Sequence, residues 1–333
     1  MFPLYIWNLA LSITNACNLR CKHCYAMSGV ALPNELSFDT IKDILIPQVK
    51  KANVKFITLT GGEPFCHPNI LDIISEIRKT GIKVSIATNG TNIDEEMLSS
   101  LKRLGVSRIQ ISLEGSTAQL NDIVRGKGVY DKILSIIPKI VESGIHTAIS
   151  FTPTTHNYTD IKKMSDLCLN LGVNTLSIRR YSNSGRAMTN HLEATKLKNK
   201  KLLTQICNLR KDSSYSKLNI LTGDPLIALI DVKYKEFSDN VLAGCTAGIS
   251  SLAIDSEGNI KPCTRADIVC GNIIKDDLCD IWENDILLNQ LRDRNNLMGK
   301  CETCEVKMVC GGCRACALQS SGSIFGEDSS CWL

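Results

Sequence analysis

The sequence predicts an α/β fold in which a parallel sheet comes first and a small, loop-rich, cysteine-rich domain follows. Three observations lead to this prediction: a regular alternation of strand-like and helix-like segments in the first half, a length of 333 residues, and 16 cysteines gathered mainly near the two ends. A chain of this length is long enough for about two domains. Repeated strand–helix units favour a parallel sheet with helices on its faces.

Six strand-like segments are rich in apolar or β-branched residues. They are Tyr5–Thr14, Phe56–Thr60, Lys83–Ala87, Arg108–Leu113, Thr147–Phe151 and Thr175–Arg180. Helix-like segments with apolar residues at helical spacing lie between them at Phe38–Lys51, Ile70–Lys79, Asp94–Leu104, Asp131–Ser143 and Asp160–Leu171. Several of these helices are followed by a glycine that suits a left-handed cap, namely Gly81, Gly105, Gly144 and Gly172. Because ligands of parallel sheets bind at the carboxyl ends of the strands, we expect the functional site there.

Composition excludes several classes of protein. Hydrophobic residues make up 44% and charged residues 22% of the chain, as in ordinary globular proteins. No apolar run approaches the roughly 20 residues that span a bilayer, and the apolar N-terminal segment lacks the basic start and cleavage site of a signal peptide. We therefore expect a cytoplasmic protein. The net charge of +4 is small and scattered, and the dense run Lys196–Lys201 is interpreted as a solvated face, so no nucleic-acid partner is expected.

The sequence Cys17-Asn18-Leu19-Arg20-Cys21-Lys22-His23-Cys24 places three thiols in a C-x₃-C-x₂-C run directly after the first strand. Three thiolates this close can hold three irons of a [4Fe–4S] cluster and leave the remaining iron open to a small ligand. The alternatives are a zinc site, which prefers four ligands in two short pairs, or simply buried thiols.

This pattern resembles the radical S-adenosylmethionine (SAM) enzymes, in which the open iron chelates SAM. The resemblance implies a partial (β/α)6 barrel and reductive cleavage of SAM to a 5′-deoxyadenosyl radical that abstracts a substrate hydrogen. Three later strand ends also resemble motifs of this family: Thr60-Gly61-Gly62-Glu63-Pro64, Thr88-Asn89-Gly90 and Ser112-Leu113-Glu114-Gly115.

From this resemblance we assign SAM-contacting residues. Gly61 and Gly62 would allow a close backbone approach, Glu63 would hold the amino group of SAM, and Ser112 would bind the ribose. Asn89 is either a ligand contact or a turn residue with positive φ. Glu114 stands where the family usually has Asp.

Three further residues are assigned in the same way. His23 is expected to stack on the adenine rather than to form a hydrogen bond beside the cluster. Arg125 matches a recurring arginine of the family, although a solvated loop charge is an alternative. Of the adjacent Arg179 and Arg180 only one can face the barrel interior, and the resemblance favours Arg180 for the SAM carboxylate.

The C-terminal cysteines form the order C-x₁₂-G-x₄-C, C-x₂-C-x₅-C-x₂-C and a late cysteine, which resembles the SPASM extension of radical SAM enzymes. The resemblance implies two auxiliary iron–sulfur clusters. One would be held by Cys301, Cys304, Cys310 and Cys331, and the other by Cys245, Cys263 and Cys313. The fourth ligand of the second cluster is left open between Cys270, Cys279, Cys316 and a free iron, and Cys313 and Cys316 could exchange roles.

The predicted domains are a radical SAM partial barrel at 1–182, a connector bordering the substrate at 183–244, and a SPASM domain at 245–333. Within the connector a polar helix is expected near His191–Lys211 and an apolar segment at Asn219–Ile230. Three isolated cysteines, Cys66, Cys168 and Cys207, are interpreted as structural thiols.

The resemblance implies a radical SAM oxidoreductase that modifies a ribosomally made peptide or protein side chain, with the auxiliary clusters accepting electrons. An external donor such as flavodoxin or ferredoxin is expected. Cys17 lies so near the N-terminus that a leader-peptide-binding domain would have to be a separate adaptor, or the substrate would be a small molecule. The alternatives are tetrapyrrole side-chain modification, as in haem or haem d1 pathways, and a non-enzymatic iron–sulfur or zinc protein.

Overall fold

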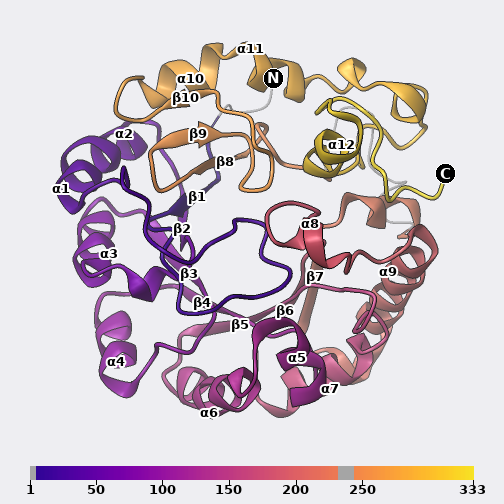
Figure 1. Ribbon diagram of the computed structural model, residues 1–333, viewed down its shortest axis with the longest axis horizontal. Helices are drawn as coiled ribbons and strands as arrows, with labels where there is room; N and C mark the ends of the chain where they lie inside the picture. The colour runs from indigo at the N-terminus through magenta and orange to yellow at the C-terminus, as the bar shows by residue number, and fades with distance from the viewer. Residues whose placement is uncertain (1–4, 232–243) are drawn as a thin grey trace.

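The computed structural model describes residues 5–231 and 244–333, and it confirms the α/β fold with a parallel sheet (Figure 1). The described strands form one sheet in the order β10-β9-β8-β1-β2-β3-β4-β5-β6-β7. Their bounds are β1 Asn8–Ser12, β2 Phe56–Thr60, β3 Lys83–Thr88, β4 Arg108–Ser112, β5 His146–Phe151, β6 Thr175–Ile178, β7 Asn219–Thr222, β8 Ser251–Ile254, β9 Asn259–Lys261 and β10 Gly271–Asn272.

The sheet extends beyond the six predicted strands on both sides. Strands β1 to β7 pair in parallel with their neighbours, and β7 comes from the predicted connector. Strand β8, from the cysteine-rich part, pairs in parallel with β1, and β9 and β10 follow in antiparallel pairing. These additions cover the edges that β1 and β6 would otherwise expose. Residues 232–243 of the predicted connector lie outside the described residues.

Helices pack around the outside of the curved sheet (Figure 1). They are α1 Phe38–Thr40, a π-helical turn Ile41–Leu45, α2 Ile46–Lys51, α3 Ile70–Lys79, α4 Glu95–Arg103, α5 Ala118–Arg125, α6 Val129–Glu142, α7 Ile161–Asn170, α8 Ala187–Asn190, α9 Lys196–Lys211, α10 Leu278–Asn284, α11 Ile286–Arg292 and α12 Arg314–Ser321. The four predicted capping glycines all have positive φ, between 70° and 85°.

The two faces of the sheet differ in polarity. Ile57 and Ile109 are 0% exposed and belong to the apolar core under the helices. Because side chains alternate along a strand, the intervening residues line the inner face of the barrel. There Thr58 and Ser85 form a hydrogen bond of 2.9 Å between their hydroxyl oxygens. The inner face is therefore polar, as a surface that receives a polar ligand would be.

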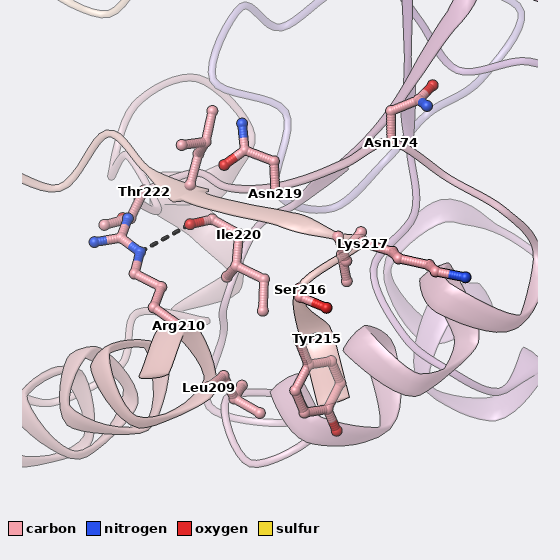
Figure 2. A pocket seen from close by; sticks show the side chains of 11 residues that line it. Asn174, Leu209, Arg210, Tyr215, Ser216, Lys217, Asn219, Ile220 and Thr222 are labelled. Atoms are coloured by element: carbon pink, nitrogen blue, oxygen red, sulfur yellow. Dashed lines mark hydrogen bonds between the residues drawn. The ribbon is translucent and has the colours of Figure 1, made fainter. Parts of the chain in front are cut away.

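A pocket of about 550 Å³ lies beside the free edge of β7, where the Arg210 Nε donates to the Ile220 carbonyl at 2.8 Å (Figure 2). None of the predicted site residues lines it. Among the described residues, no helix combines the length and the apolar character needed to cross a membrane.

Candidate functional site

The loop after β1 carries Cys17, Cys21 and Cys24 across the front of the sheet (Figure 1). Cys21 is buried and the other two are half-buried. Burial raises the pKa of Cys17 to about 11, and Glu63 and the other two thiols add to this increase. Three thiols this close would repel one another as thiolates. Because iron stabilises the thiolate form, this donor set fits an iron–sulfur cluster.

Glu35 braces this cysteine loop from one side. Its carboxylate accepts hydrogen bonds from the Thr14 hydroxyl at 2.8 Å, from the Asn15 backbone N–H at 2.5 Å and from the Leu32 N–H at 3.0 Å. Sequence reasoning missed this role, since an isolated Glu in a loop has no local signature. Glu35 therefore fixes the backbone that leads into Cys17.

Gly61 and Gly62 pack against the cysteine loop itself. The Gly62 N–H donates to the Thr14 carbonyl at 2.7 Å. A Cβ at Gly61 would lie 2.3 Å from that carbonyl oxygen, and one at Gly62 would lie 2.3 Å from the Ala16 oxygen. The glycine pair therefore permits a close approach between two segments of the chain, whereas the sequence argument assigned that approach to a ligand.

Glu63 and Asn89 are brought together from the ends of β2 and β3. The fully buried Glu63 carboxylate accepts the Asn89 backbone N–H and the Thr88 hydroxyl, each at 2.7 Å. Burial raises the pKa of Glu63 despite these hydrogen bonds. A cationic group placed beside it would favour its ionised form.

Asn89 also holds the cysteine loop. Its side-chain nitrogen donates to the Asn18 Oδ1 at 2.8 Å, and Asn18 in turn donates to Thr91 at 2.7 Å. The alternative interpretation of Asn89 as a residue with positive φ is wrong, because the positive φ in this turn belongs to Gly90.

Glu114 lies at the centre of a buried charge network. It accepts Arg125 Nη2 at 2.6 Å, faces His23 Nε2 at 3.0 Å and accepts the Thr152 N–H at 2.6 Å. Burial alone would raise the pKa of Glu114, but Arg125 and His23 outweigh it and lower it to about 2. Arg125 Nη1 also lies 3.8 Å from the Cys21 sulfur.

This network revises two interpretations. His23 forms a hydrogen bond with Glu114, which was the less favoured of its two expected roles. Its stacking on adenine stays a prediction. Arg125 is not a solvated loop charge, because it is buried between Glu114 and a thiol of the cysteine loop.

The two adjacent arginines after β6 point to different places. Arg179 Nη2 donates to Gln110 on the inner face at 3.2 Å. Arg180 is buried and forms hydrogen bonds of 2.6 and 2.5 Å with both carboxylate oxygens of Asp328, and one of 3.3 Å with Asp224. The prediction that Arg180 faces the barrel interior is therefore wrong, since this side chain links the barrel to the C-terminal segment.

Ser112 lies at the carboxyl end of β4, where the ribose site was predicted. Its side chain is half-buried and has no hydrogen-bond partner within the described part of the chain. Its hydroxyl is therefore available for a ligand.

The first predicted set of auxiliary ligands surrounds one cavity. Its lining includes all four of the assigned cysteines, Cys301, Cys304, Cys310 and Cys331. Burial raises the pKa of Cys331, and the nearby Cys301 and Cys304 add to this increase, which agrees with the arrangement. This set fits a four-thiolate cluster.

The second set gathers around Cys313. Burial raises the pKa of Cys245, and Cys313 and Cys263 add to this increase. Cys316 shares a hydrogen bond with Cys313 that lowers the pKa of Cys313. Arg265 lies beside Cys313, Cys263 and Cys316. The structure thus brings Cys316 to the site that needs a fourth ligand.

The other two candidates for that ligand lie elsewhere. The hydrogen-bond partner of Cys270 is Asp285, and the charged neighbours of Cys279 are Asp277, Lys51 and Glu283. No cysteine figures among the groups that shift the pKa of either thiol in the described chain.

The three isolated cysteines differ in position. Cys168 and Cys207 belong to the apolar core. Cys66 is half-buried in the turn that follows Glu63, and it accepts a hydrogen bond from Asn92 at 3.7 Å.

Buried arginines accompany the C-terminal thiols. Arg294 is 2% exposed, donates to the Cys245 carbonyl at 2.8 Å and has the Cys245, Cys310 and Cys301 thiols as electrostatic neighbours. Arg314 is 1% exposed and donates to the Ile324 and Gly326 carbonyls. Buried cations require nearby negative charge, and thiolate-ligated clusters provide it.

Arg186 is a second bracing residue that the sequence argument did not single out. Its guanidinium donates to the Cys21 carbonyl at 3.1 Å and to the Ser28 carbonyl at 2.8 Å. The preceding Gly185 has a φ of 57°, and a Cβ there would lie 2.5 Å from the Tyr25 carbonyl oxygen. The segment after β6 therefore packs closely against the cysteine loop and forms hydrogen bonds with it.

These features define an α/β barrel protein with one three-thiol site and a second thiol-rich region. The description "Radical SAM superfamily" applies to a family profile that matches residues 11–168, and "Iron-sulfur cluster-binding domain" (SPASM) to one that matches 245–305. The mycofactocin maturase MftC of Mycobacterium ulcerans is 30% identical over 97% of this chain and 87% of its own length. The AdoMet-dependent heme synthase of Methanosarcina barkeri is 28% identical over 97% of this chain and 95% of its own length.

Solved structures share the fold. Streptococcus suis SuiB bound to the precursor peptide SuiA superposes with a TM-score of 0.78 at 23% identity, over 99% of this chain and 76% of SuiB. The enzyme anSMEcpe with bound AdoMet has a TM-score of 0.75 at 16% identity, over 97% of this chain and 93% of its own.

The chain therefore belongs to the radical SAM superfamily and carries a SPASM iron–sulfur cluster-binding domain. It is a radical SAM oxidoreductase whose cofactors are SAM and iron–sulfur clusters.

Proposed function

We propose that this enzyme oxidatively modifies a side chain of a ribosomally made peptide or protein, by a crosslink or a related maturation. One observation carries the proposal. The three-thiol loop lies close to the Glu63 carboxylate at the strand ends, and the same chain holds two further sets of thiols. The similarity to a relative named mycofactocin maturase over nearly the whole chain, together with the fold shared with SuiB bound to the precursor peptide SuiA, supports a peptide substrate.

Cys17, Cys21 and Cys24 would hold the SAM-binding cluster. When bound and reduced, this cluster supplies the electron that cleaves SAM to a 5′-deoxyadenosyl radical, which removes a hydrogen atom from the substrate. Glu63 would bind the ammonium group of SAM, and Ser112 would offer its free hydroxyl to the ribose. Burial raises the pKa of Cys21, and the positive charge of Arg125 beside it partly offsets this by favouring the thiolate form.

The C-terminal thiols would hold two auxiliary clusters. One set is Cys301, Cys304, Cys310 and Cys331. The other is Cys245, Cys263, Cys313 and, as we infer from its place beside Cys313, Cys316. We further propose three domains: a barrel at 1–182, a connector at 183–244 and a SPASM domain at 245–333. The enzyme would be cytoplasmic and would receive electrons from a flavodoxin or ferredoxin. A separate adaptor would bind the leader peptide of the substrate.

The substrate class is tested with anaerobically reconstituted protein, reductant and SAM. A peptide encoded beside the gene should lose the mass of about two hydrogens per modification while 5′-deoxyadenosine accumulates. If no such peptide is modified, and a porphyrin instead loses mass under the same conditions, the peptide proposal fails. Tetrapyrrole modification is the second candidate, because a relative named heme synthase covers nearly the same length.

The assignment of Glu63 has its own test. Glu63→Ala should weaken SAM binding about tenfold or more, as expected for loss of a hydrogen bond between charged groups. Glu76→Ala on the outer face of α3 is the matched control, since Glu76 pairs with Lys79 of the same helix. Unchanged SAM affinity in a Glu63→Ala protein with full iron content would contradict the assignment.

A further inference from the structure

The lysine run at the start of α9 lies beside the C-terminal thiols. Lys196 lines the same cavity as the four thiols of the first auxiliary set, Cys301, Cys304, Cys310 and Cys331. One turn further along the helix, the Lys200 ammonium group lies over the ring of Trp332, 5.9 Å from its centroid. Figure 1 shows α9 next to the C-terminal end of the chain. The run that the sequence indicated as a solvated face therefore borders one of the proposed cluster sites.

The cysteine-rich domain adds two lysines at the same place. Lys300 and Lys307 both line the cavity of the first auxiliary set. The Lys300 Nζ donates to the Leu333 carbonyl at 2.8 Å, and the Lys307 Nζ donates to the Asn295 Oδ1 at 3.2 Å. Two segments that are far apart in the sequence therefore bring their ammonium groups to one cavity.

These lysines lack a carboxylate partner in the described part of the chain. The ion pairs of that part that involve a lysine use Lys51, Lys79, Lys139, Lys162 and Lys261. Lys196, Lys200 and Lys300 are exposed, and Lys307 is half-buried. Their positive charges are therefore free to attract an anionic partner.

The acidic groups nearby lie on the side of the cysteine-rich domain. Glu327 lines the cavity, and its carboxylate accepts the Lys300 backbone N–H at 2.8 Å. Glu302 and Glu305 are exposed and flank Cys304 in the sequence. Helix α9 carries only basic charges, since its sequence KLKNKKLLTQICNLRK contains no Asp or Glu. The positive field at this place therefore comes mainly from α9.

The stability of α9 does not explain these charges. Lys196, Lys198 and Lys200 occupy the first turns of the helix, where the partial positive charge of a helix N-terminus disfavours cations. Helix α4, by contrast, has Glu95 and Glu96 in its first turn. A cationic start costs helix stability, and a partner with negative charge would offset that cost.

Exposed apolar side chains lie next to the lysines. Leu197, beside Lys196, is 76% exposed, and Met298, two residues before Lys300, is 56% exposed. Together with Lys200 these residues form what we call the lysine surface. Apolar contacts surrounded by charged groups are typical of protein interfaces, and encounters between redox proteins need only a small one.

The position of the lysine surface suits electron transfer. In the proposed function the auxiliary clusters take electrons from the substrate, so each turnover leaves a reduced cluster that must be oxidised again. A redox protein on the lysine surface would lie directly over the cavity of the first auxiliary set. Electron transfer between proteins requires such proximity of the two redox centres.

We propose that the lysine surface docks a small acidic one-electron carrier protein, which reoxidises the cluster of the first auxiliary set. One electron leaves the reduced cluster and reduces the oxidised carrier, and no atom passes between the two proteins. This inference rests on the proposed function, because it concerns the electrons that the reaction releases. Attraction between the lysines and an acidic carrier would steer the encounter.

The first test measures binding of oxidised flavodoxin, an acidic flavin carrier, to the anaerobically reconstituted holoenzyme by calorimetry. Cytochrome c, a basic one-electron carrier, is the probe of opposite charge. Flavodoxin should bind, its affinity should fall about tenfold when the salt is raised from about 0.05 to about 0.5 M, and cytochrome c should not bind.

The test variant combines three substitutions that remove positive charge from the lysine surface: Lys196→Gln, Lys200→Gln and Lys300→Gln. The matched control removes three exposed positive charges from α2, α4 and α6: Lys50→Gln, Lys102→Gln and Lys132→Gln. Both proteins have the same net charge, so a difference between them reports the position of the charge. The test variant should bind flavodoxin about tenfold more weakly, and the control should bind like the wild type.

The second test follows the electron. The Cys17/Cys21/Cys24→Ala protein is used here, because it should hold only the C-terminal clusters. After reduction and removal of the reductant it should convert oxidised flavodoxin to the flavin semiquinone, followed by stopped-flow absorbance. Adding the three lysine substitutions should slow this step about tenfold at limiting flavodoxin.

Four results would overturn the inference: no flavodoxin binding, equal binding by the test and control variants, binding without semiquinone formation, or tighter lysine-dependent binding of a glutamate-rich peptide than of flavodoxin. The last result would make the lysine surface a peptide site. SAM cleavage under dithionite needs no carrier protein and tests the proposed function separately. A wild-type protein that cleaves SAM but shows no lysine-dependent carrier binding refutes only this inference.

Discussion

The two thiol-rich regions of this chain differ in the balance of charged groups beside them. The N-terminal cysteine loop and its surroundings have the carboxylates Glu35, Glu63 and Glu114 as well as Arg125 and Arg186. In the C-terminal region the buried charged groups beside the thiols are mostly arginines, including Arg294 and Arg265. SAM carries ammonium and sulfonium cations, which suit a carboxylate-lined site. Clusters ligated only by thiolates are anionic and suit buried cations.

This difference implies that loss of the N-terminal cluster should leave the C-terminal clusters in place. Changing Cys17, Cys21 and Cys24 together to Ala should abolish 5′-deoxyadenosine formation and leave about eight of roughly twelve irons per chain, if each site holds four. Cys279→Ala is the control and should retain full iron and cleavage. SAM cleavage by the triple variant under dithionite would show that these three cysteines do not hold the cluster that cleaves SAM.

The C-terminal side of the comparison depends on Cys316. Cys316→Ala should lower the iron content by up to about four per chain, because it removes the proposed fourth thiolate of one cluster. Cys270→Ala should have no such effect. The reverse pattern, full iron in Cys316→Ala and loss in Cys270→Ala, would return the fourth ligand to Cys270.

Arg180 joins the two regions, so its loss should destabilise the whole chain. Arg180→Met leaves Asp328 and Asp224 without their buried cation and should lower the free energy of unfolding by about 3–5 kcal/mol, measured by anaerobic urea unfolding. Lys139→Met, which removes an exposed pair with Glu95, is the control and should change nothing measurable. Equal stability of both variants would show that Arg180 is not the link.

The sequence predicted contacts between neighbouring strands better than contacts between distant segments. Glu63 and Asn89 follow adjacent parallel strands, so their proximity could be expected before the structure was known. The Arg180–Asp328 pair joins residues 148 positions apart, and no local pattern indicates such a partner. The choice between Arg179 and Arg180 failed for a related reason, because side-chain direction past a strand end depends on the register.

The smallest expected effect concerns Glu114. Arg125 and His23 lower its pKa to about 2, from an ordinary value of 4.5. The stabilising contribution of the ionised group is therefore present above pH 4.5 and is lost as the pH falls from 4.5 towards 2. In this window the stability of the apo-protein should fall more steeply than that of Glu114→Gln, by at most about 1.4 kcal/mol per pH unit. Parallel pH profiles in urea unfolding would contradict the network.

The central claim is that only the N-terminal site binds SAM. Electron paramagnetic resonance of the reduced, reconstituted protein with and without SAM tests it most directly. The wild type should show one cluster signal that changes when SAM is added, and the Cys17/Cys21/Cys24→Ala protein should show cluster signals that do not respond. A SAM-dependent change that survives in the triple variant would contradict the account.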